Sequence, residues 1–242
     1  MVGDLMALRS SVTIVASPRP RVGKTLLARL LTDFHRQEGR EVAAFDLNSG
    51  GGTLAQFLPA HTAISAIADV KGQIALFDRL VADDGVSKVV DLGHESFEGF
   101  FALAQQIGFV EEARRRAIAP AILFATTPDA TSVEAFRGLR RRFPQALLAP
   151  VHNEIFGPAP HRDKYELKGS VLARLPALAP TLRKYIETPP FSFADEALAA
   201  AGLPPAAHDE LQHWLRRVYR EFRELDLRIL LADLQSSIRL PS

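Results

Sequence analysis

The stretch that decides the fold runs Val12-Thr-Ile-Val-Ala-Ser-Pro-Arg-Pro-Arg-Val-Gly-Lys-Thr-Leu-Leu-Ala-Arg-Leu-Leu31. A β-branched apolar run ends in a loop, the loop closes with Gly23-Lys24-Thr25, and an amphipathic helix follows at once. This order is typical of a phosphate-binding loop, in which backbone N–H groups and a helix N-terminus face a polyphosphate. In this interpretation Lys24 reaches the β- and γ-phosphates, and Thr25 gives its hydroxyl to Mg²⁺.

The loop departs from the usual pattern G-x-x-x-x-G-K-[ST], because Pro18 stands where that pattern has its first glycine. Pro18 and Pro20 also remove two backbone donors from a loop that otherwise offers them to phosphate. For this window alone, the alternative interpretation is a strand, a turn and a helix with a chance Gly-Lys-Thr.

The composition limits the class of protein. A chain of 242 residues is long enough for one large α/β domain. Its net charge of +1 produces no overall electrostatic attraction to nucleic acid or membranes. It has no cysteine, which excludes disulfides, thiol catalysis and cysteine-ligated metal centres. The sequence has no recognisable signal peptide and no apolar run long enough to span a bilayer, so we expect a cytoplasmic protein.

Apolar strand-like runs alternate with helical stretches along the chain. The expected strands are Val12–Ala16, Val42–Phe45, Val86–Val90, Ala121–Ala125, Ala146–Val151 and Ser170–Leu175. The expected helices are Thr25–Gln37, Ile74–Ala82, Phe97–Ile107, Glu111–Ile118 and Ser132–Phe143, and an irregular polar loop is expected over Phe156–Gly169. The alternation predicts an α/β fold: a three-layer P-loop NTPase domain, with helices on both faces of a mainly parallel sheet.

Polar side chains follow the expected strands where each strand ends. Asp46 and Asn48 follow the second strand, Asp91 the third, Thr126-Thr127-Pro128-Asp129 the fourth and Asn153 the fifth. Ligands of parallel sheets bind at the carboxyl ends of the strands, so one shared site is predicted there.

A long helix is expected over roughly Ala206–Leu234, after Pro204-Pro205. We therefore divide the chain into a P-loop domain over residues 1–203 and a C-terminal helical extension over 204–242. Apolar residues recur at spacings of four and three in a first stripe, with a second stripe beside it: Leu211, Leu215, Val218, Phe222, Leu225 and Ile229, then Leu227, Leu231, Leu234 and Ile238. Such a helix packs on its own domain, dimerises or binds a partner protein.

With these motifs the sequence resembles the ParA/MinD family of P-loop ATPases. The family's deviant phosphate loop, Lys-Gly-Gly-x-Gly-Lys-[Ser/Thr], aligns without gaps with Arg19-Pro-Arg-Val-Gly-Lys-Thr25. The family's Asp-x-Asp aligns with Asp46-Leu-Asn48, and its Thr-x-Pro-Glu segment is similar to Thr126-Thr-Pro-Asp129. The resemblance spans Val12 to Ala197. The segments Asn153–Pro158 and Thr188–Ala197 are also similar to a plasmid subgroup typified by the conjugative-transfer proteins TraL and StbB.

The resemblance implies ATP and Mg²⁺ as cofactors and a homodimer with nucleotide between the subunits. The implied nucleotide contacts are Arg21, Val22, Gly23, Lys24, Thr25 and Leu26 in the loop, with Asn153 and Pro176 at the adenine base. Mg²⁺ is implied at Thr25, Asp46 and Asp91, the last in a segment similar to Walker B. Lys24, Asn48 and Arg19 are the implied catalytic residues, Arg19 replacing a lysine that crosses the dimer interface.

Asn48 stands where the family has the aspartate that acts on the attacking water. An amide cannot accept a proton, so we expect ATP hydrolysis to be slow. The implied role is an ATP-dependent switch that partitions or positions a plasmid or other cargo through an unidentified cargo or adaptor protein. The alternative is a degenerate P-loop protein that binds nucleotide weakly or not at all and serves as an interaction scaffold.

Two arginine clusters lie on expected helices and are candidates for binding DNA phosphates, as surface patches do in ParA relatives. The clusters are Arg114, Arg115 and Arg116, and Arg137 with Arg140, Arg141 and Arg142. Glu111 and Glu112 accompany the first cluster, so only the second is clearly basic. It is a candidate for non-specific DNA binding or a solvated helix face.

Overall fold

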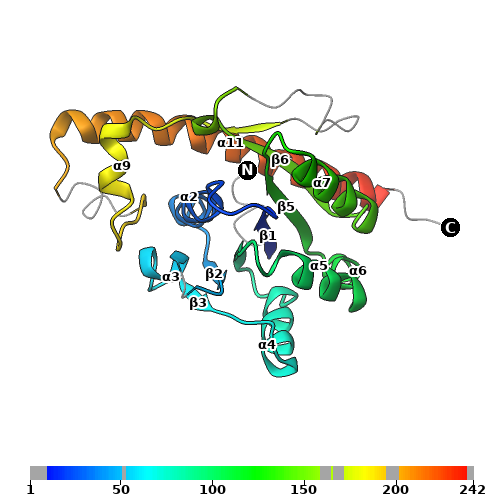
Figure 1. The fold of residues 1–242 in the computed structure, drawn as a ribbon. Coiled ribbons are helices and arrows are strands. Elements are labelled where there is room, and N and C mark those ends of the chain that lie inside the picture. Colours follow the sequence, from blue (N-terminus) through cyan, green and yellow to red (C-terminus); the bar gives the residue numbers. More distant parts are fainter. Residues whose placement is uncertain (1–9, 51–52, 159–164, 166–171, 195–201, 239–242) are drawn as a thin grey trace.

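The structure is a computed structural model that describes residues 10–50, 53–158, 165, 172–194 and 202–238, with side chains as far as residue 231. Its centre is a seven-stranded sheet in the order β3-β2-β4-β1-β5-β6-β7 (Figure 1). The strands are β1 (Ser11–Ala16), β2 (Val42–Leu47), β3 (Thr62–Ile64), β4 (Ser87–Leu92), β5 (Ala119–Ala125), β6 (Leu147–Asn153) and β7 (Ala173–Leu175). All six neighbouring pairs are parallel, so the carboxyl ends of the strands meet at one edge.

Helices cover both faces of this sheet. They are α2 (Lys24–Gln37), α3 (Thr53–Phe57), α4 (Val70–Leu80), α5 (Phe97–Gln106), α6 (Phe109–Arg115), α7 (Ala130–Arg142), the 3-10 helix η1 (Glu154–Phe156), α9 (Pro180–Ile186) and α11 (Pro205–Ile238). The predicted α/β P-loop fold with a long C-terminal helix is confirmed. The sequence interpretation missed β3, α3 and α9, which are three, five and seven residues long and too short for a periodic pattern.

Several predicted boundaries shift because of local capping. Helix α4 begins at Val70 rather than Ile74, since the Asp69 side chain accepts a hydrogen bond from the Gly72 N–H at 2.8 Å. Helix α6 ends at Arg115 rather than Ile118, because Ala117 adopts a positive φ of 58°. Of the predicted strand Ser170–Leu175, the structure shows Ala173–Leu175, and residues 170 and 171 lie outside the described residues. Most of the loop predicted over Phe156–Gly169 also lies outside them.

Alternate residues of each central strand enter two apolar layers. Ile14, Phe45 and Phe124 pack with α4, α5, α6 and α7 on one face. Val15 and Leu123 pack on the other face with α2, α9 and α11. This period of two within uniformly buried strands is expected when a parallel sheet is covered on both sides.

Helix α11 runs along the α2 side of the sheet (Figure 1). The residues of its first stripe from Leu211 to Leu225 are buried, and the Trp214 indole N–H donates to the Pro176 carbonyl at 2.9 Å. In this part, burial of the first stripe favours the first of the three alternatives, in which the helix packs on its own domain. In the second stripe, Leu227 and Leu231 are exposed, and the side chains of Leu234 and Ile238 lie outside the description.

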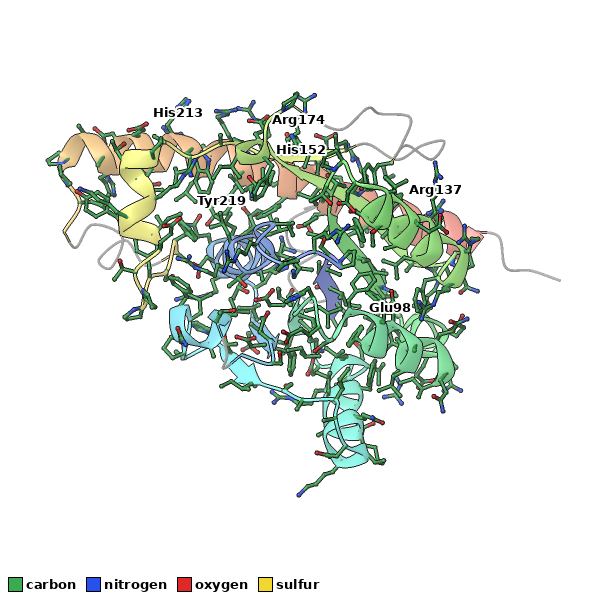
Figure 2. All side chains as sticks on the ribbon, in the orientation of Figure 1. Glu98, Arg137, His152, Arg174, His213 and Tyr219 are labelled. Atoms are coloured by element: carbon green, nitrogen blue, oxygen red, sulfur yellow. The ribbon has the colours of Figure 1, made fainter. Side chains whose placement is uncertain are left out.

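Buried polar contacts fix the outer side of α2 to late segments of the chain. The fully buried Asp33 carboxylate accepts hydrogen bonds from the Ser192 hydroxyl at 3.0 Å and the Phe193 N–H at 2.6 Å. The Phe34 ring contacts the rings of Tyr219 and Phe222, and Tyr219 is labelled in Figure 2. Within the described part of the chain, no helix is both long and apolar enough to cross a bilayer.

Candidate functional site

The loop between β1 and α2 closes tightly around its own backbone. Gly23 adopts a φ of 92° and Arg21 a φ of 57°, so the loop needs a left-handed turn at a position without glycine. The buried Lys24 ammonium donates to the Arg19 carbonyl at 2.7 Å across the loop. Burial lowers the pKa of Lys24, and the nearby Asp91 carboxylate opposes that shift. Lys24 is thus held at the mouth of the loop as a partly desolvated cation.

The N-terminus of α2 is built to accept an anion. No described side chain caps it, and its first turn contains no acidic residue. The N–H groups of a first helical turn have no partners within the helix, and here they belong to Lys24, Thr25 and Leu26. Because the helix dipole adds positive potential at this end, an anion placed there is stabilised.

The structure brings Thr25 and Asp91, two of the residues implied at Mg²⁺, into contact. The Thr25 hydroxyl donates to Asp91 Oδ2 at 2.7 Å, although the two residues are 66 positions apart. Asp91 is fully buried, and its other oxygen, Oδ1, has no hydrogen-bond partner among the described residues. Burial raises the pKa of Asp91 to about 6, with the Asp46 carboxylate also raising it and the hydrogen bond from Thr25 lowering it.

Asp46 is also fully buried, but both of its oxygens are occupied. Oδ2 accepts from the N–H groups of Leu54 and Ala55 at the start of α3, at 2.6 and 3.0 Å. Oδ1 accepts from the backbone and side-chain amides of Asn48, at 3.1 and 2.8 Å. Asp46 therefore orders the turn after β2 and the first turn of α3. This geometry favours an indirect role of Asp46 at a metal, through the residues that it positions.

A Mg²⁺ ion fits the donors present. It prefers hard oxygen ligands and takes only one or two from the protein when phosphates and water supply the rest. Thr25 Oγ1 and Asp91 are such donors, and the unpartnered buried Oδ1 of Asp91 has capacity for a further contact. Among the described residues, no group of three or more His, Cys, Asp or Glu side chains could hold a metal ion. A Mg²⁺ ion at Thr25 and Asp91 would therefore also need oxygen ligands from phosphate or water.

Arg19, which the resemblance implies at a dimer interface, contacts a residue of its own chain in this structure. Its guanidinium bonds the Asp129 carboxylate, with Nε at 3.0 Å from Oδ1. Asp129 is the N-cap of α7 and also accepts from the Ser132 N–H at 3.1 Å. The hydrogen bonds from Arg19 lower the pKa of Asp129 and keep its carboxylate charged.

Asn153 and Pro176 lie at the same sheet edge as the loop. Asn153 pairs with Leu175 in the register of β6 and β7, which places Pro176 directly after its neighbour. The Asn153 amide donates to the Val22 carbonyl at 3.4 Å, and a Cβ on Gly23 would lie 2.6 Å from that amide nitrogen. The structure thus brings together the predicted nucleotide and metal residues along the carboxyl ends of β1, β2, β4, β6 and β7. That Asn153 and Pro176 contact the adenine base stays a prediction.

Comparison with solved structures identifies the fold. The septum site-determining protein MinD from Pyrococcus horikoshii OT3, solved with Mg-ADP, matches with a TM-score of 0.51 and 13% identity, over 90% of this chain and 97% of that one. The chain has the P-loop NTPase fold of MinD. MinD from Aquifex aeolicus (TM-score 0.49, 15% identity, 86% and 96% covered) and a putative plasmid partition protein from Borrelia burgdorferi B31 with AMPPNP (0.44, 11%, 86% and 99%) were also found. No protein-family model and no curated protein match the sequence.

The arginines of α7 differ in how available they are for contacts to DNA phosphates. Arg137 is exposed and extends from α7 (Figure 2). Arg141 bonds Glu134 at 2.8 Å, and Arg142 donates to the Gln105 side chain at 2.9 Å. In the other cluster, Arg115 and Arg116 bond Glu112. The acidic partners of α7 reduce its positive potential, so Arg137 and Arg140 are its better candidates for phosphate contacts.

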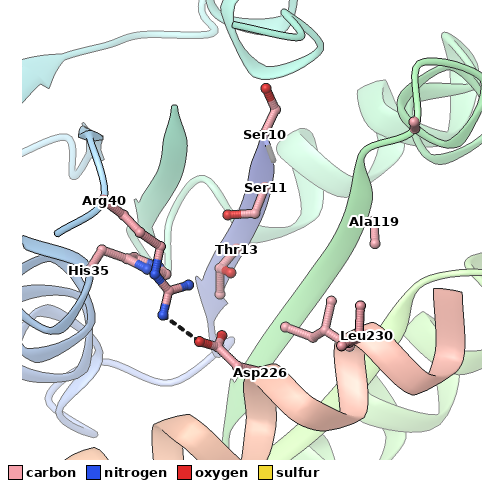
Figure 3. Close-up of a pocket in the computed structure, with 10 residues that line it drawn as sticks. Ser10, Ser11, Thr13, His35, Arg40, Ala119, Asp226 and Leu230 are labelled. Atoms are coloured by element: carbon pink, nitrogen blue, oxygen red, sulfur yellow. Dashed lines mark hydrogen bonds and ion pairs between the residues drawn. The ribbon is translucent and has the colours of Figure 1, made fainter. Parts of the chain in front are cut away.

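A second polar cluster lies at the opposite edge of the sheet. There a cavity is lined by Ser10, Ser11, Thr13, His35, Arg40, Ala117, Ala119, Asp226, Ile229 and Leu230 (Figure 3). Arg40 bonds Asp226 at 2.6 Å, which ties α11 to the short segment between α2 and β2. Both ring nitrogens of the buried His35 lack a partner among the described residues, and burial lowers the pKa of His35 to about 3.

Two partners of the site were missed from the sequence. The sequence places Asp129 only in a segment that precedes a helix, and no sequence signal links it to Arg19. Thr53 was not predicted at the site, and its hydroxyl lies 3.3 Å from that of Thr25. Both contacts depend on how strands far apart in the sequence pair, which local patterns do not reveal.

Proposed function

We propose that the chain is a Mg·ATP-binding switch protein of the ParA/MinD type. In this proposal ATP binding promotes a homodimer, and the nucleotide cycle partitions or positions a plasmid or other cargo in the cytoplasm through an adaptor protein. Conjugative plasmid transfer is one such setting. Arg137 and Arg140 supply non-specific contacts to DNA phosphates.

The observation that carries the proposal is the arrangement at the start of α2. An uncapped helix N-terminus, the Lys24 ammonium and the Thr25–Asp91 hydrogen bond of 2.7 Å converge there. These are donors for a polyphosphate and oxygen ligands for the hard cation that accompanies it. The Pyrococcus horikoshii MinD structure, which shares the fold, was solved with Mg-ADP.

Each residue has a defined task in this proposal. The amides from Arg21 to Leu26 and the Lys24 ammonium bind the phosphates, while Asn153 and Pro176 face the base. Thr25 and Asp91 hold Mg²⁺, which when bound neutralises charge on the phosphates. Asp46 keeps α3 and Asn48 in position. Arg19 reaches the nucleotide of the partner subunit once it has left Asp129.

Slow hydrolysis is part of the proposal. Both N–H groups of the Asn48 amide are directed at carboxylates, at 2.8 Å from Asp46 and 3.0 Å from Asp91. The Asn48 side chain is an amide and not a base, so it cannot remove a proton from water. A general base typically contributes about 10²- to 10⁴-fold, so turnover is expected to be low while binding persists.

A second candidate function is an interaction scaffold without nucleotide. It is favoured by the same loop, where Pro18 and Pro20 offer no N–H and Arg19 is engaged by Asp129. In this case Lys24 keeps the loop closed through the Arg19 carbonyl, as it does in the structure.

Thermal unfolding in millimolar Mg·ATP separates the two functions. Saturation at a hundredfold excess over the dissociation constant stabilises a protein by about 2.7 kcal/mol. We expect the wild type to be stabilised, Lys24→Ala to lose the effect, and the exposed Lys71→Ala control to keep it. If Mg·ATP leaves the wild type unchanged, or stabilises Lys24→Ala equally, the switch proposal is wrong and the scaffold is favoured.

A further inference from the structure

Asn48 joins two buried carboxylates that would otherwise repel each other. Its Nδ2 atom donates to Asp46 Oδ1 at 2.8 Å and to Asp91 Oδ2 at 3.0 Å, and its backbone N–H also donates to Asp46. Asp46 and Asp91 are both fully buried, and they pair directly across β2 and β4. The side-chain amide thus uses one N–H for each acid.

The surroundings hold this amide in one place. A Cβ on Gly93 would lie 2.8 Å from the Leu47 carbonyl and 3.2 Å from Asn48 Oδ1, so the residue at position 93 has to be glycine for the turn to pack here. The other oxygen of Asp46 is fixed by the N–H groups of Leu54 and Ala55. Asn48 is consequently a rigid connection between the turn after β2 and the acid of β4.

We propose that Asn48 is a positioning residue that substitutes for a cation: it keeps Asp46 and Asp91 in their binding geometry when no metal is bound. The structure is then assembled before Mg²⁺ or nucleotide arrives. A carboxylate at position 48 has no N–H to donate and would add a third negative charge beside two buried ones. With aspartate there, the same cluster would depend on Mg²⁺ for its stability.

The inference rests on the proposed function only where nucleotide is concerned, so its first test uses Mg²⁺ alone. Melting temperatures are compared in EDTA and in millimolar MgCl₂ for the wild type, Asn48→Asp and Ser49→Asp. Ser49 is exposed, so Ser49→Asp adds the same charge one residue further without entering the cluster.

We expect the wild type and Ser49→Asp to melt at the same temperature with and without Mg²⁺. Asn48→Asp should melt lower in EDTA, by about 4 °C or more, and recover most of this loss in Mg²⁺. An Asn48→Asp protein that melts like the wild type in EDTA, or gains no more from Mg²⁺ than the wild type, overturns the inference.

Asn48→Ala covers the case in which Asn48→Asp does not fold in EDTA. It removes the two side-chain hydrogen bonds without adding charge, so we expect a lower melting temperature that Mg²⁺ does not restore. Melting at the wild-type temperature would overturn the inference.

A second measurement examines the same residue with nucleotide. The affinity for ATP is measured with and without Mg²⁺, and the ratio of the two affinities should be about tenfold larger for Asn48→Asp than for the wild type, a coupling of typical size. Equal ratios overturn the inference. If no variant binds ATP, the proposed function fails, whereas the melting experiment still decides the role of Asn48.

Discussion

Arg19 Nε lies 3.0 Å from Asp129 Oδ1, so the first residue of the phosphate-loop motif Arg19–Thr25 is held by the N-cap residue of α7. Both side chains are partly exposed, at 40% and 37%, and a pair of this kind contributes little to stability. The ion pair matters because Asp129 competes with phosphate for Arg19: a polyphosphate and Asp129 cannot both bind the same guanidinium group in a bidentate way.

Asp129→Asn should strengthen nucleotide-dependent dimerisation by releasing Arg19. The expected gain is modest, up to roughly fivefold, because an exposed ion pair is worth only about 0.2 to 1 kcal/mol. Asparagine still caps a helix, so α7 is retained. Asp69→Asn is the matched control, since Asp69 caps α4 by the same hydrogen bond to a backbone N–H. Sedimentation with and without ATP measures the effect, and equal behaviour of the two variants would contradict it.

Gly23→Ala should disrupt the phosphate loop more than Gly39→Ala disrupts the end of α2. Both glycines have a positive φ, at 92° and 73°, so both substitutions carry backbone strain of about 1 kcal/mol. Only at Gly23 would the new Cβ also collide, at 2.6 Å from the Asn153 amide nitrogen, whereas Gly39 has nothing within 4 Å. Urea unfolding of both variants measures the difference. A Gly23→Ala protein as stable as Gly39→Ala would show that the Asn153 side chain moves away freely.

His35 should make the protein sensitive to acid. Its pKa is about 3 in the folded protein and about 6.5 when unfolded, so the unfolded chain binds more protons between these values. The contribution of His35 to stability is therefore complete above about pH 6.5, and it is lost as the pH falls toward 3, by a few kcal/mol in all. His35→Met should lose less stability than the wild type between about pH 7 and pH 4, as measured by denaturant unfolding. The exposed His213→Gln is the control and should follow the wild type.

The ion pair between Arg40 and Asp226 should show strong coupling. Their side chains are only 9% and 17% exposed, so removal of one partner leaves a nearly buried charge. Arg40→Met and Asp226→Leu should each destabilise the fold by roughly 3 kcal/mol. The double variant should be more stable than the sum of the two losses predicts. Additive losses in denaturant unfolding would mean that the two charges do not interact.

The sequence predicted the fold because its strands are uniformly apolar and its polar residues stand at the strand ends. Gly23, Lys24, Thr25 and Asp91 could be placed in one site because parallel strands carry their carboxyl ends to a common edge. The finer geometry could not be predicted. Whether Asn48 faces water or two carboxylates depends on the register of β2 against β4, in which Asp46 lies opposite Asp91.

The charge pattern of the sequence also could not show which arginines are free to contact phosphates. Arg137 and Arg141 lie on the same helix, but a bond to Glu134 seven positions earlier reduces the availability of Arg141. The apolar pattern of α11 left three alternatives open, and the buried first stripe favours packing on the domain. It did not indicate that Leu227 and Leu231 remain exposed, because periodicity gives the face of a helix but not the extent of the surface that covers it.

Synthesis from the N-terminus delivers α2 long before the segments that enclose it. The hydroxyl that Asp33 binds lies 159 positions later in the chain, and the carboxylate that Arg40 binds lies 186 positions later. At about 5 to 20 residues per second, these partners follow α2 out of the ribosome after roughly ten to forty seconds. During that interval β1, the phosphate loop and α2 have been synthesised, while the segments that cover the Phe34 side of α2 have not. Aggregation and chaperone capture of the nascent chain are therefore expected at this surface, before the rings of Tyr219 and Phe222 arrive to cover it.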